Sequence, residues 1–76
     1  MYRNEYSKAL GHAARYSENI GDGRRMTWRV DMTEQEAVKR LRQAGLSFTK
    51  VTTSARQVTY NGFTYTNYYV RVYVSK

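Results

Sequence analysis

The chain contains no cysteine and no proline, has one histidine, and carries no acidic residue after Glu36. Without cysteine it forms no disulfide and no thiolate metal site, and its redox compartment is left open. A lone histidine, His12, does not build a zinc centre. No apolar run approaches the roughly 20 residues that span a bilayer, and the first residues lack the apolar core of a secretory signal. We therefore expect a soluble cytoplasmic protein with no metal, cofactor or membrane partner.

Large aliphatic side chains are also scarce. The 76 residues allow a single domain, residues 1–76, with a small core. Seven valines, three leucines and one isoleucine are supplemented by eight tyrosines, two phenylalanines and one tryptophan. Because tyrosine joins an apolar ring to a polar hydroxyl, it suits both a core wall and a binding surface.

The net charge of +7 is unevenly distributed. Residues 1–36 carry six basic and six acidic side chains, whereas residues 37–76 carry seven basic side chains and no acidic one. Such a segment attracts anionic partners, of which nucleic acid is the commonest. The alternative is a basic surface that serves only solubility.

Two helices and a strand are predicted in the first half. Apolar residues at helical spacing predict a helix over residues 4–20, capped by Asn4 or Ser7 and ended by the turn at residues 21–23. Residues 26–31 alternate as a half-buried strand does. Thr33 and Glu36 form a capping-box pattern. A second helix is therefore expected from Glu34 to Ala44, with Ala37, Val38, Leu41 and Ala44 buried and Glu36 placed to pair with Arg40.

The second half predicts a long β-hairpin. Asn61-Gly62 stands between aromatic residues, which is typical of a type I′ turn. Folding about that turn pairs Tyr60 with Phe63, Val58 with Tyr65, Arg56 with Asn67, Thr53 with Val70, and Val51 with Val72. Val51, Thr53, Val70 and Val72 then share the core side, and Thr52, Ser54, Tyr69, Arg71 and Tyr73 the other.

Farther along the hairpin, the core-side positions become polar: Gln57, Thr59, Thr64 and Thr66. The distal half is therefore expected to project beyond the core. The alternative is a break near Ser54-Ala55 that gives two shorter strands. In either case the fold class is α+β, with two helices packed on one face of a small antiparallel sheet, in the order helix, strand, helix, strand, strand.

The hairpin carries the main functional hypothesis. It interleaves rings with cations, namely Tyr60, Phe63, Tyr65, Tyr68, Tyr69 and Tyr73 with Lys50, Arg56 and Arg71. Rings stack on bases and cations neutralise phosphates, while a two-stranded ribbon also fits the major groove of B-DNA. The alternative is that the tyrosines only complete a thin core.

Two further basic pairs are candidate phosphate contacts. Lys39 and Arg42 are expected on the exposed side of the second helix, as a binding ridge or as an ordinary solvated surface. Arg24 and Arg25 follow the glycine-rich turn, where adjacent guanidinium groups suit a phosphate, although Asp22 opposes an anion there and a plain loop is the simpler interpretation.

The leading hypothesis is a small basic protein that binds DNA or RNA without catalysis. An inhibitor of the kind that phages and plasmids encode, bound to an acidic surface of a host protein, is the first alternative, because tyrosine and arginine dominate protein interfaces. A metal-independent ribonuclease-like toxin that uses His12 is the second. An open strand at Tyr68–Val74 would also allow a homodimer through sheet edges.

Overall fold

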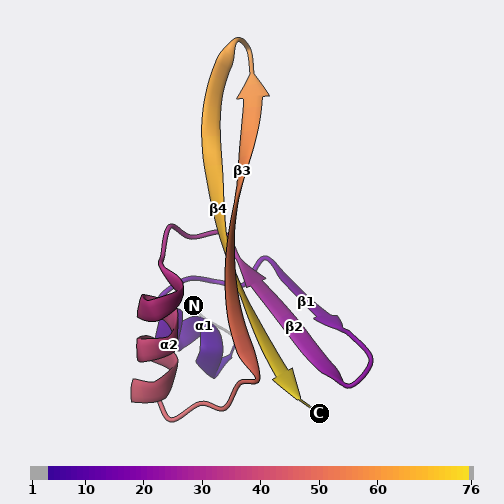
Figure 1. The fold of residues 1–76 in the computed structure, drawn as a ribbon, viewed down its shortest axis with the longest axis vertical. Coiled ribbons are helices and arrows are strands. Elements are labelled where there is room, and N and C mark those ends of the chain that lie inside the picture. Colours follow the sequence, from indigo (N-terminus) through magenta and orange to yellow (C-terminus); the bar gives the residue numbers. More distant parts are fainter. Residues whose placement is uncertain (1–3, 76) are drawn as a thin grey trace.

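The computed structural model describes residues 4–75. Along the chain the elements are α1 (Glu5–Leu10), β1 (Tyr16–Asn19), β2 (Gly23–Trp28), α2 (Glu34–Gln43), β3 (Lys50–Tyr60) and β4 (Phe63–Ser75). The strands form one antiparallel sheet in the order β1-β2-β4-β3, as Figure 1 shows. The α+β class is confirmed, and the sheet contains one strand more than expected. No helix within residues 4–75 is long and apolar enough to cross a membrane.

The additional strand comes from the segment predicted to continue the first helix. α1 ends at Leu10 because Gly11 adopts a left-handed φ of 76°, and its N–H donates to the Ser7 carbonyl at 2.8 Å. The prediction of a helix over residues 4–20 was therefore wrong beyond Leu10. Tyr16 pairs instead with Thr27, at the start of a β1–β2 hairpin. Tyr16 is 57% exposed, so it does not belong to the core as the helical spacing suggested.

α2 forms as its capping signal predicts. The Thr33 hydroxyl accepts a hydrogen bond from the Glu36 N–H at 3.1 Å, which satisfies one of the unpaired amides of the first turn. Glu36 also pairs with Arg40 at 3.1 Å. Ala37 and Leu41 are buried, so this side of α2 faces the sheet. Ala44 caps the helix and is exposed, contrary to its predicted burial.

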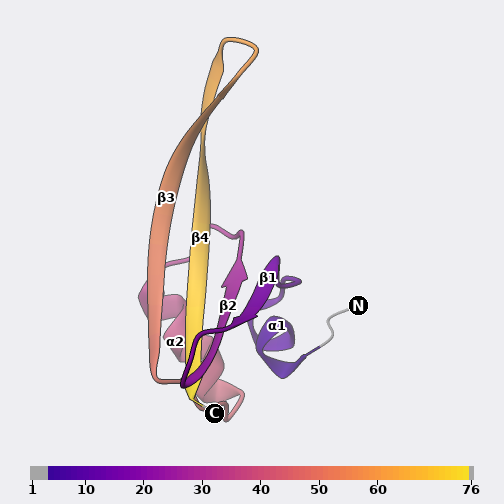
Figure 2. The same cartoon turned by 90° about the vertical axis from the view of Figure 1, so that its right-hand side faces the viewer.

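Both helices lie on the same side of the sheet (Figures 1 and 2). Between helices and sheet lies a core of eight buried residues: Leu10, Met26, Trp28, Ala37, Leu41, Val51, Val70 and Val72. The one buried indole is satisfied, because Trp28 Nε1 donates to the Ser7 Oγ at 3.0 Å. β2 also approaches β4 very closely, since a Cβ at Gly23 would lie 2.0 Å from the Val74 carbonyl oxygen. Any larger residue at this position would push the two strands apart.

The long hairpin has the predicted register, with all five expected pairs present. Asn61 and Gly62 have φ of 51° and 80°, the positive values that a type I′ turn requires. β3 and β4 run without interruption, so the alternative of a break near Ser54-Ala55 was wrong. The pairing of β4 with β2 stops at Val70, and the part of the hairpin beyond it projects from the body (Figure 1). We call residues 56–67 the distal hairpin.

β4 occupies an interior position in the sheet. Residues Val70–Ser75 pair with β2 on one side, and β3 covers the other side as far as Tyr73. The expectation of an open strand at Tyr68–Val74 was therefore wrong for most of that segment, because the β1–β2 hairpin occupies the place where a second copy would pair. The outer strands of the sheet are β1 and β3.

Candidate nucleic-acid interface

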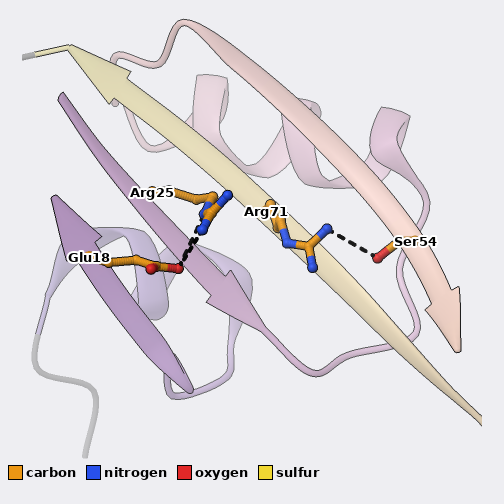
Figure 3. Close-up of polar contacts among 4 residues, drawn as sticks. All are labelled: Glu18, Arg25, Ser54 and Arg71. Atoms are coloured by element: carbon orange, nitrogen blue, oxygen red, sulfur yellow. Dashed lines mark hydrogen bonds and ion pairs between the residues drawn. The ribbon is translucent and has the colours of Figure 1, made fainter. Parts of the chain in front are cut away.

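The sheet face opposite the helices, here called the open face, collects charged and aromatic side chains. Directly paired residues share a face and neighbours along a strand alternate. Since Val51, Val70 and Val72 face the core, the intervening positions face away from it. They are Tyr16 and Glu18 of β1, Arg25 and Thr27 of β2, Tyr69, Arg71 and Tyr73 of β4, and Lys50, Thr52, Ser54 and Arg56 of β3. Figure 3 shows Glu18, Arg25, Arg71 and Ser54 in front of the sheet, with the helices behind it.

A shallow groove of about 460 Å³ lies on the open face. Its lining contains two tyrosines, three arginines, one carboxylate and two hydroxyl side chains: Tyr16, Tyr69, Arg25, Arg56, Arg71, Glu18, Thr27 and Ser54. Every strand of the sheet contributes to this lining. The sheet order is what brings these distant segments of the sequence together.

The carboxylate in the groove is already paired. Arg25 donates to Glu18 Oε1 from Nη2 at 2.8 Å and from Nε at 3.2 Å (Figure 3). The hydrogen bond to Glu18, and after it that to Tyr73, raises the pKa of Arg25 above its ordinary value. Within the described chain, Glu18 is the one acidic side chain that lines the groove. Its negative charge is largely neutralised by Arg25.

Tyr73 lies in a positive environment. Burial favours a higher pKa for its phenol, but hydrogen bonding to Arg25 and Thr52, together with the charges of Arg25 and Lys50, lowers the pKa below its ordinary value. The Lys50 ammonium also stands over the Tyr73 ring, 4.5 Å from its centroid, in a cation–π arrangement. The same positive charge that favours a phenolate here favours a bound anion.

Three cations of the open face have no carboxylate partner among residues 4–75. Within residues 4–75, the salt bridges join Arg25 to Glu18 on the open face and Arg40 to Glu36 on α2. Arg71 donates only a long hydrogen bond, from Nη1 to the Ser54 hydroxyl at 3.5 Å (Figure 3). Arg56 and Lys50 are exposed. Three of the seven basic side chains of residues 37–76 are therefore available on this face, whereas Lys39, Arg40 and Arg42 belong to α2.

The aromatic residues of the distal hairpin continue the open face. Tyr60 pairs with Phe63 and Val58 with Tyr65, in the same alternation as Arg56 with Asn67. Tyr60, Phe63 and Tyr65 are 68%, 76% and 48% exposed. Tyr68 belongs to the other face, where it lines a hollow with Met32, Thr53 and Ala55.

The remaining predicted site residues lie elsewhere. Lys39 and Arg42 are exposed on the outer side of α2, and α2 lies behind the sheet. Arg24 and Arg25 are consecutive residues of β2, so their side chains lie on opposite faces. The two guanidinium groups therefore do not form the joint phosphate site that a flexible turn would have allowed.

Tyr16 and Glu18 are not among the predicted site residues, because helical spacing predicts a helix over their segment. Their signal in the sequence was the alternation of Tyr16, Glu18 and Ile20 up to the glycine-rich turn at residues 21–23. His12 lies exposed in the loop between α1 and β1. Among residues 4–75 there is no group of histidine, aspartate and glutamate that could hold a metal ion.

No protein-family model, curated protein or solved structure matches this chain.

Proposed function

We propose that this protein binds nucleic acid on its open face and has no catalytic role. The observation that carries the proposal is the composition of this face: four cations, three of them without a carboxylate partner in the described chain, beside exposed aromatic rings. Phosphate groups are the anions that a polynucleotide offers at regular intervals, so an extended row of cations suits it better than it suits a single small anion.

The two kinds of side chain have complementary tasks. Arg71 and Arg56 line the groove, and their guanidinium groups can donate paired hydrogen bonds to phosphate oxygens. Tyr16 and Tyr69 line the same groove, within reach of a base or sugar attached to such a phosphate. The ion pair of Glu18 with Arg25 fixes the position of both side chains in the groove. The positive potential of the face then comes from the other cations.

The test is the fluorescence anisotropy of labelled single- and double-stranded DNA and RNA, measured at low salt and at about 0.15 M salt. Arg71→Ala and Arg56→Ala should each weaken binding and lower the slope of log affinity against log salt by about one. Lys39→Ala and Arg42→Ala are the matched controls, because they remove the same charge from the far side of the molecule. We expect them to change the slope by clearly less.

Equal effects of all four substitutions would mean that the net charge of +7 acts without a defined site, and the proposal would fail. It would also fail if every polyanion, heparin included, bound equally well and only at low salt. The exposed tyrosines and arginines would then favour the acidic surface of a protein partner, since these residues dominate protein interfaces.

A further inference from the structure

We infer that the distal hairpin stacks unpaired bases, so that this protein selects single-stranded nucleic acid over duplex. This inference rests on the proposed function and identifies the form of the ligand. It is drawn from the two faces of the distal hairpin, which differ sharply in chemistry.

One face of the distal hairpin, the ring face, carries Val58, Tyr60, Phe63 and Tyr65, with Arg56 at its root. The other, the back face, carries Gln57, Thr59, Thr64 and Thr66 at the intervening positions. On the back face the hydroxyls of Thr59 and Thr64 are 3.1 Å apart and hydrogen-bonded to each other. Rings and cation therefore share one face, and the back face is polar and uncharged.

The rings of the ring face are not needed by the core. No residue of the distal hairpin belongs to the buried cluster or to the partly buried residues packed against it. Cross-strand contact of Tyr60 with Phe63 stabilises the turn region, yet both side chains remain more than two-thirds exposed. A ring exposed to this degree offers its surface to a ligand, and contiguous exposed apolar patches mark binding sites.

A duplex fits these two faces poorly. In its grooves the bases present edges of donors and acceptors, which are read by polar side chains, while the base faces are already stacked on one another. The ring face has few polar groups for such edges, and the back face has no cation for the flanking phosphates. A single strand leaves its base faces free, and aromatic side chains stack on them without regard to sequence.

The ring face is also continuous with the groove. Arg56 lines the groove and lies next along the same face of β3 from Val58 and Tyr60. β3 contains 11 residues, and the ten steps of about 3.3 Å from Lys50 to Tyr60 extend about 33 Å. A single strand lying along β3 and β4 thus meets phosphate-binding cations at the base and stacking rings near the tip.

The experiment compares single strands of about 15 nucleotides, long enough to span about 33 Å, with duplexes of the same sequence. Anisotropy is measured for DNA and RNA at about 0.15 M salt. We expect single strands to bind about tenfold or more tightly than duplexes, because two or three stacked rings act together. Tyr60→Ala, Phe63→Ala and Tyr65→Ala should each weaken single-strand binding by about fivefold or more. The salt slope should stay unchanged, since no cation is removed.

Thr59→Ala and Thr64→Ala are the matched controls, because this pair lies between the Tyr60–Phe63 and Val58–Tyr65 pairs and its side chains are on the back face. Both should bind single strands as the parent does, and circular dichroism should show every variant folded. Duplex binding as tight as single-strand binding, with the salt slope still reduced by Arg71→Ala, would overturn this inference and leave the proposed function standing. Losses confined to the back-face variants would overturn the ring-face assignment. Absence of binding to any nucleic acid would remove the proposed function as well.

Discussion

β3 and β4 form two regions that share one ladder of backbone hydrogen bonds but differ in their core-side residues and in what covers them. At the base, the core side carries Val51, Val70 and Val72, which are 4%, 0% and 0% exposed beneath the helices. In the distal hairpin, the same side of the ladder carries glutamine and threonine and has no helix over it. Burial of apolar surface stabilises the base, whereas the distal hairpin depends on its ladder, its turn and cross-strand contacts. Stability and binding should therefore be separable by mutation.

The largest expected effect on stability comes from the core. Leu41→Ala removes a fully buried side chain, and should lower the free energy of unfolding by about 2–5 kcal/mol because a cavity remains. Phe63→Ala, on an exposed ring, should change it by no more than about 0.5 kcal/mol. Urea denaturation followed by the fluorescence of the buried Trp28 measures both. If both variants lost a comparable free energy of unfolding, the tip of the hairpin would contribute to stability as much as the core does. The two regions would then not differ in this respect.

A shortened hairpin sharpens the same contrast. Deleting residues 57–60 and 63–66 joins Arg56 to Asn67 through the retained Asn61-Gly62 turn. Four residues leave each strand, so the Arg56–Asn67 pairing and the face of every remaining side chain are preserved. We expect the free energy of unfolding to change by no more than about 1 kcal/mol. Single-strand binding should fall at least as far as in the most affected ring-face variant.

The control for the shortened hairpin is its affinity for polyanions at low salt, which the groove cations alone should sustain. A shortened protein that still binds single strands like the parent would place the binding surface entirely at the base. One that no longer unfolds cooperatively would show that the distal hairpin contributes to the stability of the base.

The smallest expected effect concerns the titration of Tyr73 at the base. Arg25→Gln should raise the pKa of Tyr73 toward its ordinary value of 10.0, because the hydrogen bond and charge of Arg25 lower it. The absorbance of the phenolate, taken as the difference from a Tyr73→Phe variant, measures this pKa. An unchanged titration in Arg25→Gln would show that Arg25 does not contact the phenol.

The sign of the accompanying stability effect follows from the lowered pKa of Tyr73. The folded protein holds the phenolate more favourably than the unfolded chain does, so ionisation of Tyr73 stabilises the fold. That contribution is fully present above the unfolded value near 10.0 and is lost as the pH falls through the lower folded value.

The parts of the fold that could be predicted rest on short-range rules. The Thr33–Glu36 cap involves residues within one helical turn. Asn61-Gly62 specifies a two-residue turn, and once that turn is set the alternation of strand side chains determines every pair down to Val51 and Val72. In these segments the local preference and the tertiary structure agree.

The sequence by itself therefore determined α2, the long hairpin and its register, but it left open whether the distal hairpin projects or the strands break near Ser54-Ala55. Tertiary structure alone decided that Tyr16–Asn19 form a strand, that β4 lies inside the sheet, and that Arg25 joins Arg56 and Arg71 on one face while Lys39 and Arg42 lie behind it. The physical reason is that a strand such as β1 exists only through its partner, so the alternation of Tyr16 and Glu18 could not by itself outweigh the helical spacing of the same segment. Sheet order is settled by which strands bury Trp28, Val70 and Val72 under the helices, and this depends on contacts between residues far apart in the chain.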